Sequence, residues 1–225
     1  MRDTSLTKLS GVFSLLSAAS IIGAIVLGIA LGGRGPAAMD FGDPILLVGL
    51  QDAGAKGALL EILALVGPTL ALGAGLGWWP VLRDRGSYVA LGVLLWYLGM
   101  IFVIWQDAAE LALVLHLTHH YAAADGASAE ALLAIGSISS EVIHIMMVLG
   151  DLVSFFGLLL VSLAMLGKPG RWKLLGGIGI ASAVTITIGL LYPPLLMLRL
   201  IGFILFMVWM IAMGIAMLRW RPAIA

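Results

Sequence analysis

The sequence predicts an all-α protein that crosses a membrane as a polytopic bundle of six transmembrane helices, with residues 1–225 as a single transmembrane domain. Its composition is the first indication, because 62% of the 225 residues are hydrophobic and only 11% are charged, whereas soluble domains carry roughly a quarter charged residues. The second is that several apolar runs approach or exceed about 18 residues, the length of a membrane-spanning helix. A mean hydropathy of +1.13 agrees with both.

The balance of charges and the missing cysteines exclude several classes of function. The formal net charge is zero, and without basic clusters we expect no nucleic-acid partner. Cysteine is absent, which excludes disulfides, thiolate metal ligands and cysteine nucleophiles. The lipid bilayer is the expected partner, and a homo-oligomer or a larger membrane complex stays open.

The apolar runs and the breaks between them define the expected elements. The first run is longer than the 7–15 residues of a signal-peptide core and lacks an A-x-A site, so it is expected to be retained as a helix. Residues 44–50 are too short to span and are expected to lie in the membrane interface. Residues 119–128 should form a loop, and the fourth helix is long enough to project beyond the membrane. The expected spans are residues 11–32, 57–82, 87–118, 129–166, 174–191 and 195–218.

The basic residues predict the orientation of the bundle. Arg34 and Lys56 lie in the opposite loops and Arg199 lies inside the last helix, while nine of the twelve Lys and Arg residues gather at one end. These nine are Arg2, Lys8, Arg83, Arg85, Lys168, Arg171, Lys173, Arg219 and Arg221. The positive-inside rule then makes both termini cytoplasmic in a multi-pass inner-membrane protein. Trp78, Trp79, Trp172 and Trp220 occur at the same edge, as an aromatic belt would.

The turn before the fifth helix carries a resemblance to a known family. Residues 167–176 read GKPGRWKLLG, a basic turn with a proline that leads into a helix. With the layout of residues 10–220, this stretch resembles an uncharacterised family of bacterial six-helix membrane proteins, known only as a domain of unknown function. Its members look like six-helix bundles with a long first outer loop and a polar third helix. The resemblance implies the fold and the location, and it lends no catalytic residues.

Polar residues gather between Trp105 and Asp151, a stretch that contains all four histidines. A rise of 1.5 Å per residue, counted from the cytoplasmic helix ends, puts several of them roughly 30–37 Å up. That level is the outer boundary of a hydrocarbon core about 30 Å thick. The predicted metal ligands at this level are Asp107, Glu110, Glu141 and His144. A secondary polar cluster comprises Glu61, Gln106, His116, His120, Asp151 and Arg199.

Several functions remain open for this outward-facing carboxylate and histidine site. Carboxylates with imidazole and no thiolate suit a divalent metal ion such as Zn, Fe or Mn. The lone Glu141-x-x-His144 pair favours a single metal over a di-iron site, which needs two such pairs. The cluster could instead bind protons or a solute in a transporter, sensor or accessory subunit, or form a purely structural polar belt. A hydrolase using Ser137, Ser139 or Ser140 lacks a nucleophile elbow.

Asp151 is expected deeper than the other acidic residues, at about 22 Å from the cytoplasmic end. There it should be protonated, paired or beside water, because an unpaired carboxylate in hydrocarbon is costly. Its estimated level differs from that of Arg199 by about 8 Å. We therefore expect no direct ion pair between Asp151 and Arg199, and a tolerated Asp151→Asn substitution.

Overall fold

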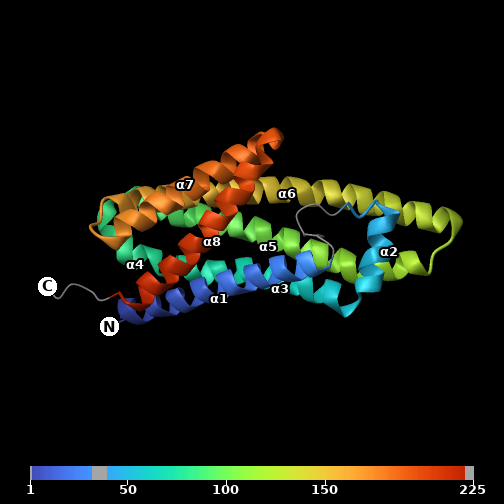
Figure 1. Cartoon of the computed structure of the whole chain (residues 1–225), viewed down its shortest axis with the longest axis horizontal. Coiled ribbons are helices and arrows are strands. Elements are labelled where there is room, and N and C mark those ends of the chain that lie inside the picture. Colours follow the sequence, from blue (N-terminus) through green and yellow to red (C-terminus); the bar gives the residue numbers. More distant parts are fainter. Residues whose placement is uncertain (1, 32–39, 221–225) are drawn as a thin grey trace.

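The computed structural model describes residues 2–31 and 40–220, and every regular element within those ranges is helical. Six helices of this part are long and apolar enough to cross a membrane, which confirms the predicted all-α, multi-pass bundle. α1 begins and α8 ends at the same end of the bundle (Figure 1). We call this end, which also carries Arg83, Arg85 and Lys168, the basic end. The opposite end, at the turn between α5 and α6, is the histidine end.

The helix bounds agree with the expected spans in the apolar stretches and differ from them at the ends. α1 begins at Arg2 rather than residue 11, while its predicted end at Gly32, and also Arg34 and Arg221, lie outside the described residues. The predicted loop over residues 119–128 was wrong except at residues 123–125, because α5, with His119 and His120 in its last turn, continues to Ala122 and α6 begins at Gly126. The helices are α1 Arg2–Ala30, α2 Pro44–Ala53, α3 Ala55–Gly75, α4 Trp78–Leu82, α5 Ser87–Ala122, α6 Gly126–Leu166, α7 Arg171–Leu191 and α8 Leu196–Leu218, with 3-10 turns at Arg83–Arg85 and Pro193–Leu195.

The six long helices form a closed ring, in which each packs on two others: α1 on α3, α3 on α5, α5 on α6, α6 on α7, α7 on α8 and α8 on α1. The contact between α5 and α6 depends on glycine. A Cβ on Gly99 would lie 2.4 Å from the backbone nitrogen of Ser154, and one on Gly157 would lie 2.5 Å from that of Trp96. Small residues at such positions let helix backbones approach closely inside a membrane.

An aromatic core fills the ring toward the basic end. It consists of Trp78 on α4, Trp96 on α5, Phe155 on α6, and Phe206 and Trp209 on α8, and the three tryptophans are fully buried. Trp78 lies 4.9 Å from Trp96 and 5.4 Å from Trp209 between ring centroids. The expectation that Trp78 and Trp172 belong to an aromatic belt was therefore wrong, because both are buried in the core, whereas Trp79 is 42% exposed.

The short helix α2 lies across the long axis of the bundle toward the histidine end (Figure 1). Asp43 starts this helix, because its Oδ1 accepts a hydrogen bond from the backbone N–H of Ile45 at 2.8 Å and Pro44 follows in the first turn. α2 packs on α5 and encloses a second apolar cluster, the distal core, which consists of Phe41, Leu47, Leu50, Val114 and Leu117.

Candidate functional site

Three carboxylic side chains are buried between the two apolar cores. Glu61 on α3 is fully buried, and Asp107 and Glu110 on α5 are 5% and 2% exposed. The charges of Glu61 and Asp107 act on Glu110, and that of Glu61 acts on Asp107, so the three carboxyl groups are electrostatic neighbours. With Gln106, which is also buried, we call them the carboxyl cluster.

The spacing of residues along α5 explains why this cluster is buried. Gln106, Glu110, Val114 and Leu117 are three or four residues apart, so they share one face of the helix. Val114 and Leu117 direct that face into the distal core. Because the face is continuous, the packing that buries these two apolar side chains also carries Gln106 and Glu110 into the protein. Gln106 and Glu110 are therefore buried polar residues on a helix face that is otherwise apolar.

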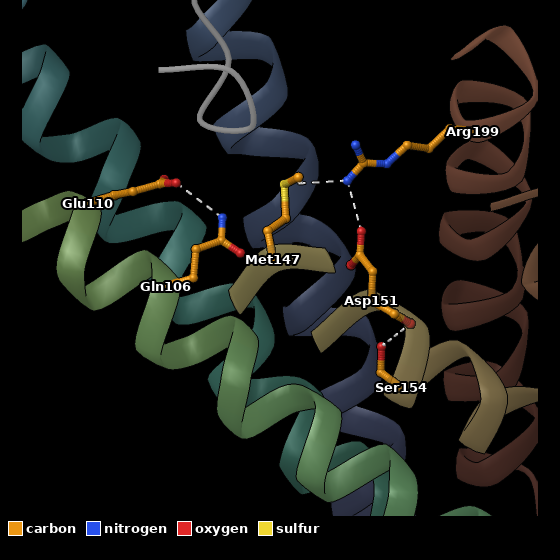
Figure 2. A network of polar contacts seen from close by, with 6 residues as sticks. All are labelled: Gln106, Glu110, Met147, Asp151, Ser154 and Arg199. Carbon is orange, nitrogen blue, oxygen red and sulfur yellow. Dashed lines mark hydrogen bonds and ion pairs between the residues drawn. The ribbon is translucent and has the colours of Figure 1, made fainter. Parts of the chain in front are cut away.

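The cluster has fewer hydrogen bonds than its oxygen atoms can accept. Gln106 Nε2 donates to Glu110 Oε1 at 3.1 Å, as Figure 2 shows. The other oxygen of Glu110 and both carboxyl oxygens of Glu61 are buried, and none of the three has a hydrogen-bond partner within residues 2–31 and 40–220. Among the described residues, no Lys or Arg forms an ion pair with Glu61, Asp107 or Glu110. A carboxylate in such surroundings is strongly disfavoured unless a proton or a cation neutralises it.

An ion pair lies beside the cluster, between α6 and α8. Arg199 Nη2 donates to Asp151 Oδ2 at 2.8 Å and also contacts Met147 Sδ at 3.5 Å (Figure 2). The side chains of Arg199 and Asp151 are 23% and 17% exposed. The charge of Asp151 also acts on Asp107, so the pair and the cluster form one series of interacting groups across α3, α5, α6 and α8.

The expectation that Asp151 and Arg199 do not pair was wrong. Their levels were estimated as if all helices ran parallel to one axis, but α8 crosses the bundle obliquely (Figure 1). A tilted helix advances less than 1.5 Å per residue along the bundle axis, so residue counting places Arg199 too far from the basic end. The long arginine side chain then reaches both Asp151 and Met147 from the first turn of α8.

The four predicted metal ligands do not come together. Asp107 and Glu110 are buried, whereas Glu141 and His144 are exposed on α6. In the part of the chain that the structure describes, no group of three or more His, Asp or Glu side chains is arranged to hold a metal ion. The structure therefore does not bring the two pairs together, and metal binding by these residues stays a prediction.

The neighbours of α6 explain why Glu141 and His144 point outward. Ile143, Met147 and Gly150 take the buried face of the helix, and a Cβ on Gly150 would lie 2.9 Å from Val103 on α5. His144 and Asp151 are seven residues apart, which brings them to nearly the same angle around α6. Arg199, in the first turn of α8, covers Asp151. Because α8 begins at that level, little of it lies beside His144.

The other residues singled out in the sequence lie outside the cluster. His116, His119 and His120 are exposed near the end of α5, with the rings of His119 and His120 5.8 Å apart. Ser140 has a structural contact, because its hydroxyl donates to the Gly136 carbonyl and accepts from the backbone N–H of Phe41. Sequence reasoning placed Glu61 in the secondary group, although a single acid within the apolar run of α3 was a signal of its importance.

Comparisons of the chain with models of protein families, with curated proteins and with solved structures give no match. The resemblance of residues 167–176 to a bacterial membrane protein family thus stays a prediction, and the function is inferred from the geometry of the site.

Proposed function

We propose that the chain binds and releases protons at the carboxyl cluster, as a proton-responsive multi-pass protein of a bacterial inner membrane. The observation that carries the proposal is Glu61, which is fully buried and whose two carboxyl oxygens have no hydrogen-bond partner in the part of the chain that the structure describes. A buried carboxyl group without a partner is stable only when neutral. Buried ionisable groups within membrane helices mark proton relays in pumps and transporters.

The neighbouring acids make proton binding a property of the group rather than of one residue. Glu61, Asp107 and Glu110 repel one another when ionised, and this repulsion is strong where the surroundings are apolar. Removing a proton from one carboxyl therefore makes it harder to remove the next. Such groups titrate in coupled steps that belong to the whole cluster.

The aromatic core supports a sensor or accessory subunit rather than a complete transporter. Fully buried Trp78, Trp96 and Trp209 fill the ring toward the basic end, so bulky side chains occupy the half that a proton path to that end would have to cross. The Asp151–Arg199 pair, whose side chains are 17% and 23% exposed, connects the series of interacting groups to the surroundings. A homo-oligomer or a larger membrane complex would then respond to the number of protons that are bound at the carboxyl cluster.

An inorganic cation is the second candidate, because it would neutralise the same unpartnered oxygens of Glu61 and Glu110. The cluster offers only oxygen ligands, which suit a hard cation such as Mg²⁺ or Ca²⁺ better than Zn²⁺. The carboxyl groups would have to draw together around the ion. Metal analysis of the protein purified without chelator distinguishes the two candidates, since stoichiometric metal that is lost in Glu61→Gln favours the cation.

Infrared spectroscopy of the protein in bilayer nanodiscs tests the proton proposal, because a protonated carboxyl group has a C=O band that a carboxylate lacks. We expect this band at neutral pH in the unaltered protein and a weaker band in Glu61→Gln. Glu141→Gln is the matched control, since Glu141 is an exposed carboxyl on α6, and it should leave the band unchanged. A spectrum without protonated carboxyl groups at neutral pH contradicts the proposal.

A further inference from the structure

A shallow, open groove of about 570 Å³ runs along the exposed face of α7 and is bordered by Leu205 of α8. Its volume falls within the roughly 300–1,000 Å³ of small-molecule sites. Leu174, Ile178 and Leu205 provide apolar walls, and Gly177 and Ala181 lie between them. Lys173 lines the end of the groove nearest the basic end.

Gly177 keeps the groove open, and helix packing does not account for it. A Cβ on Gly176 would lie 2.6 Å from the carbonyl oxygen of Ser162, and one on Gly179 would lie even closer to the Ser162 hydroxyl, so both glycines are needed for the contact with α6. A Cβ on Gly177 would meet nothing within 4 Å. Glycine weakens a helix relative to alanine, and at Gly177 it leaves room for a bound chain on the exposed face of α7.

Lys173 provides a cation at the mouth of this groove. It is exposed, and among the described residues no carboxylate forms an ion pair with it. Lys168, in the preceding turn, differs because its Nζ lies 3.1 Å from Asp84 Oδ1. α7 starts beside Lys173 without a side-chain cap on its first N–H groups, and these groups also favour an anion.

We propose that the groove binds one anionic phospholipid, with its phosphate at Lys173 and one acyl chain along Gly177 and Ala181. The groove is apolar where it runs along two membrane-spanning helices, which suits an acyl chain. Its cation lies at the basic end, where the positive-inside rule places the anionic cytoplasmic leaflet. Basic pockets between transmembrane helices on that side recognise anionic lipid head groups. This proposal is independent of the carboxyl cluster.

Native mass spectrometry of the full chain in mild detergent tests the proposal with two lipids of identical acyl chains, a phosphatidylglycerol and a phosphatidylethanolamine. We expect the unaltered protein to retain one phosphatidylglycerol in preference. Lys173→Gln should weaken phosphatidylglycerol binding about fivefold, the effect of one basic residue near an anionic surface. Gly177→Leu should reduce retention of both lipids to background, because the side chain fills the place of the acyl chain. Inorganic phosphate should not displace the bound lipid.

Two matched controls separate this site from general effects. Lys8→Gln removes an exposed lysine of the basic end outside the groove, and Ala90→Leu enlarges an exposed helix position on α5. Both should bind phosphatidylglycerol like the unaltered protein, and no variant should melt at a lower temperature than the unaltered protein. Equal retention of the two lipids by the unaltered protein, an equal loss in Lys8→Gln, displacement by inorganic phosphate, or full retention in Gly177→Leu would each overturn the proposal.

Discussion

The two halves of the bundle fill their interior with different kinds of side chain. Toward the basic end, aromatic side chains from α4, α5, α6 and α8 fill the ring, and Trp96 Nε1 donates to the Ala71 carbonyl at 3.2 Å. Toward the histidine end, the same helix α5 buries Asp107 and Glu110, which lie beside Glu61 and lack a neutralising cation among the described residues. The first half buries neutral aromatic side chains, of which Trp78 and Trp209 have indole N–H groups without a hydrogen-bond partner among the described residues. The second half buries ionisable groups, whose burial costs far more stability, as functional sites commonly do.

The largest expected effect tests the aromatic half. Trp96→Ala removes a fully buried tryptophan and should lower the free energy of unfolding by about 3–5 kcal/mol. Trp79→Ala is the control, since Trp79 is 42% exposed, and it should cost under about 1 kcal/mol. Denaturant titration in detergent measures both. Similar losses for the two variants would show that the aromatic core does not stabilise the bundle.

The next effect concerns the ion pair that joins α6 to α8. Asp151→Asn leaves Arg199 without its carboxylate, so we now expect a loss of stability rather than the tolerance expected from the sequence. Removing one partner of a fully buried pair costs about 3–5 kcal/mol, and the partial exposure of this pair reduces the expected loss to about 1–3 kcal/mol. Adding Arg199→Gln to Asp151→Asn should restore part of it. A double variant less stable than Asp151→Asn would contradict this account.

An effect of opposite sign is expected in the carboxyl cluster. Glu61→Met replaces a fully buried, unpartnered carboxyl group with an apolar side chain of similar length. The free energy of unfolding should rise by about 1 kcal/mol. Glu141→Met, at an exposed position of α6, should leave it nearly unchanged. If Glu61→Met is instead destabilising, Glu61 has a stabilising partner and the contrast between the two halves fails.

The smallest effect is expected at the residues first proposed as metal ligands on α6. Glu141→Gln and His144→Gln alter exposed side chains, so each should change the free energy of unfolding by under about 0.5 kcal/mol. The two changes should add in a double-substitution cycle. A coupling energy above about 1 kcal/mol, together with bound metal that either substitution removes, would restore the metal site that the sequence predicted.

The sequence predicted the six spans, and it did not predict which faces of the helices are buried. Apolar length alone identifies a membrane helix, so the spans could be predicted without knowledge of the packing. The direction of Glu141 and His144 depends on where Gly150 lets α6 approach α5. The pairing of Asp151 depends on the tilt of α8. Both depend on how the helices pack together, which cannot be predicted by counting residues along each helix separately.

Proton binding by the carboxyl cluster is tested most directly by a difference titration in nanodiscs. The protons bound by the unaltered protein are compared with those bound by the Glu61→Gln/Glu110→Gln variant as the pH is raised from acid through neutrality. The account predicts that the unaltered protein keeps extra protons at neutral pH, where exposed carboxyl groups with ordinary pKa values near 4 have lost theirs, and that the variant lacks them. Titration curves that coincide through neutral pH would contradict the account.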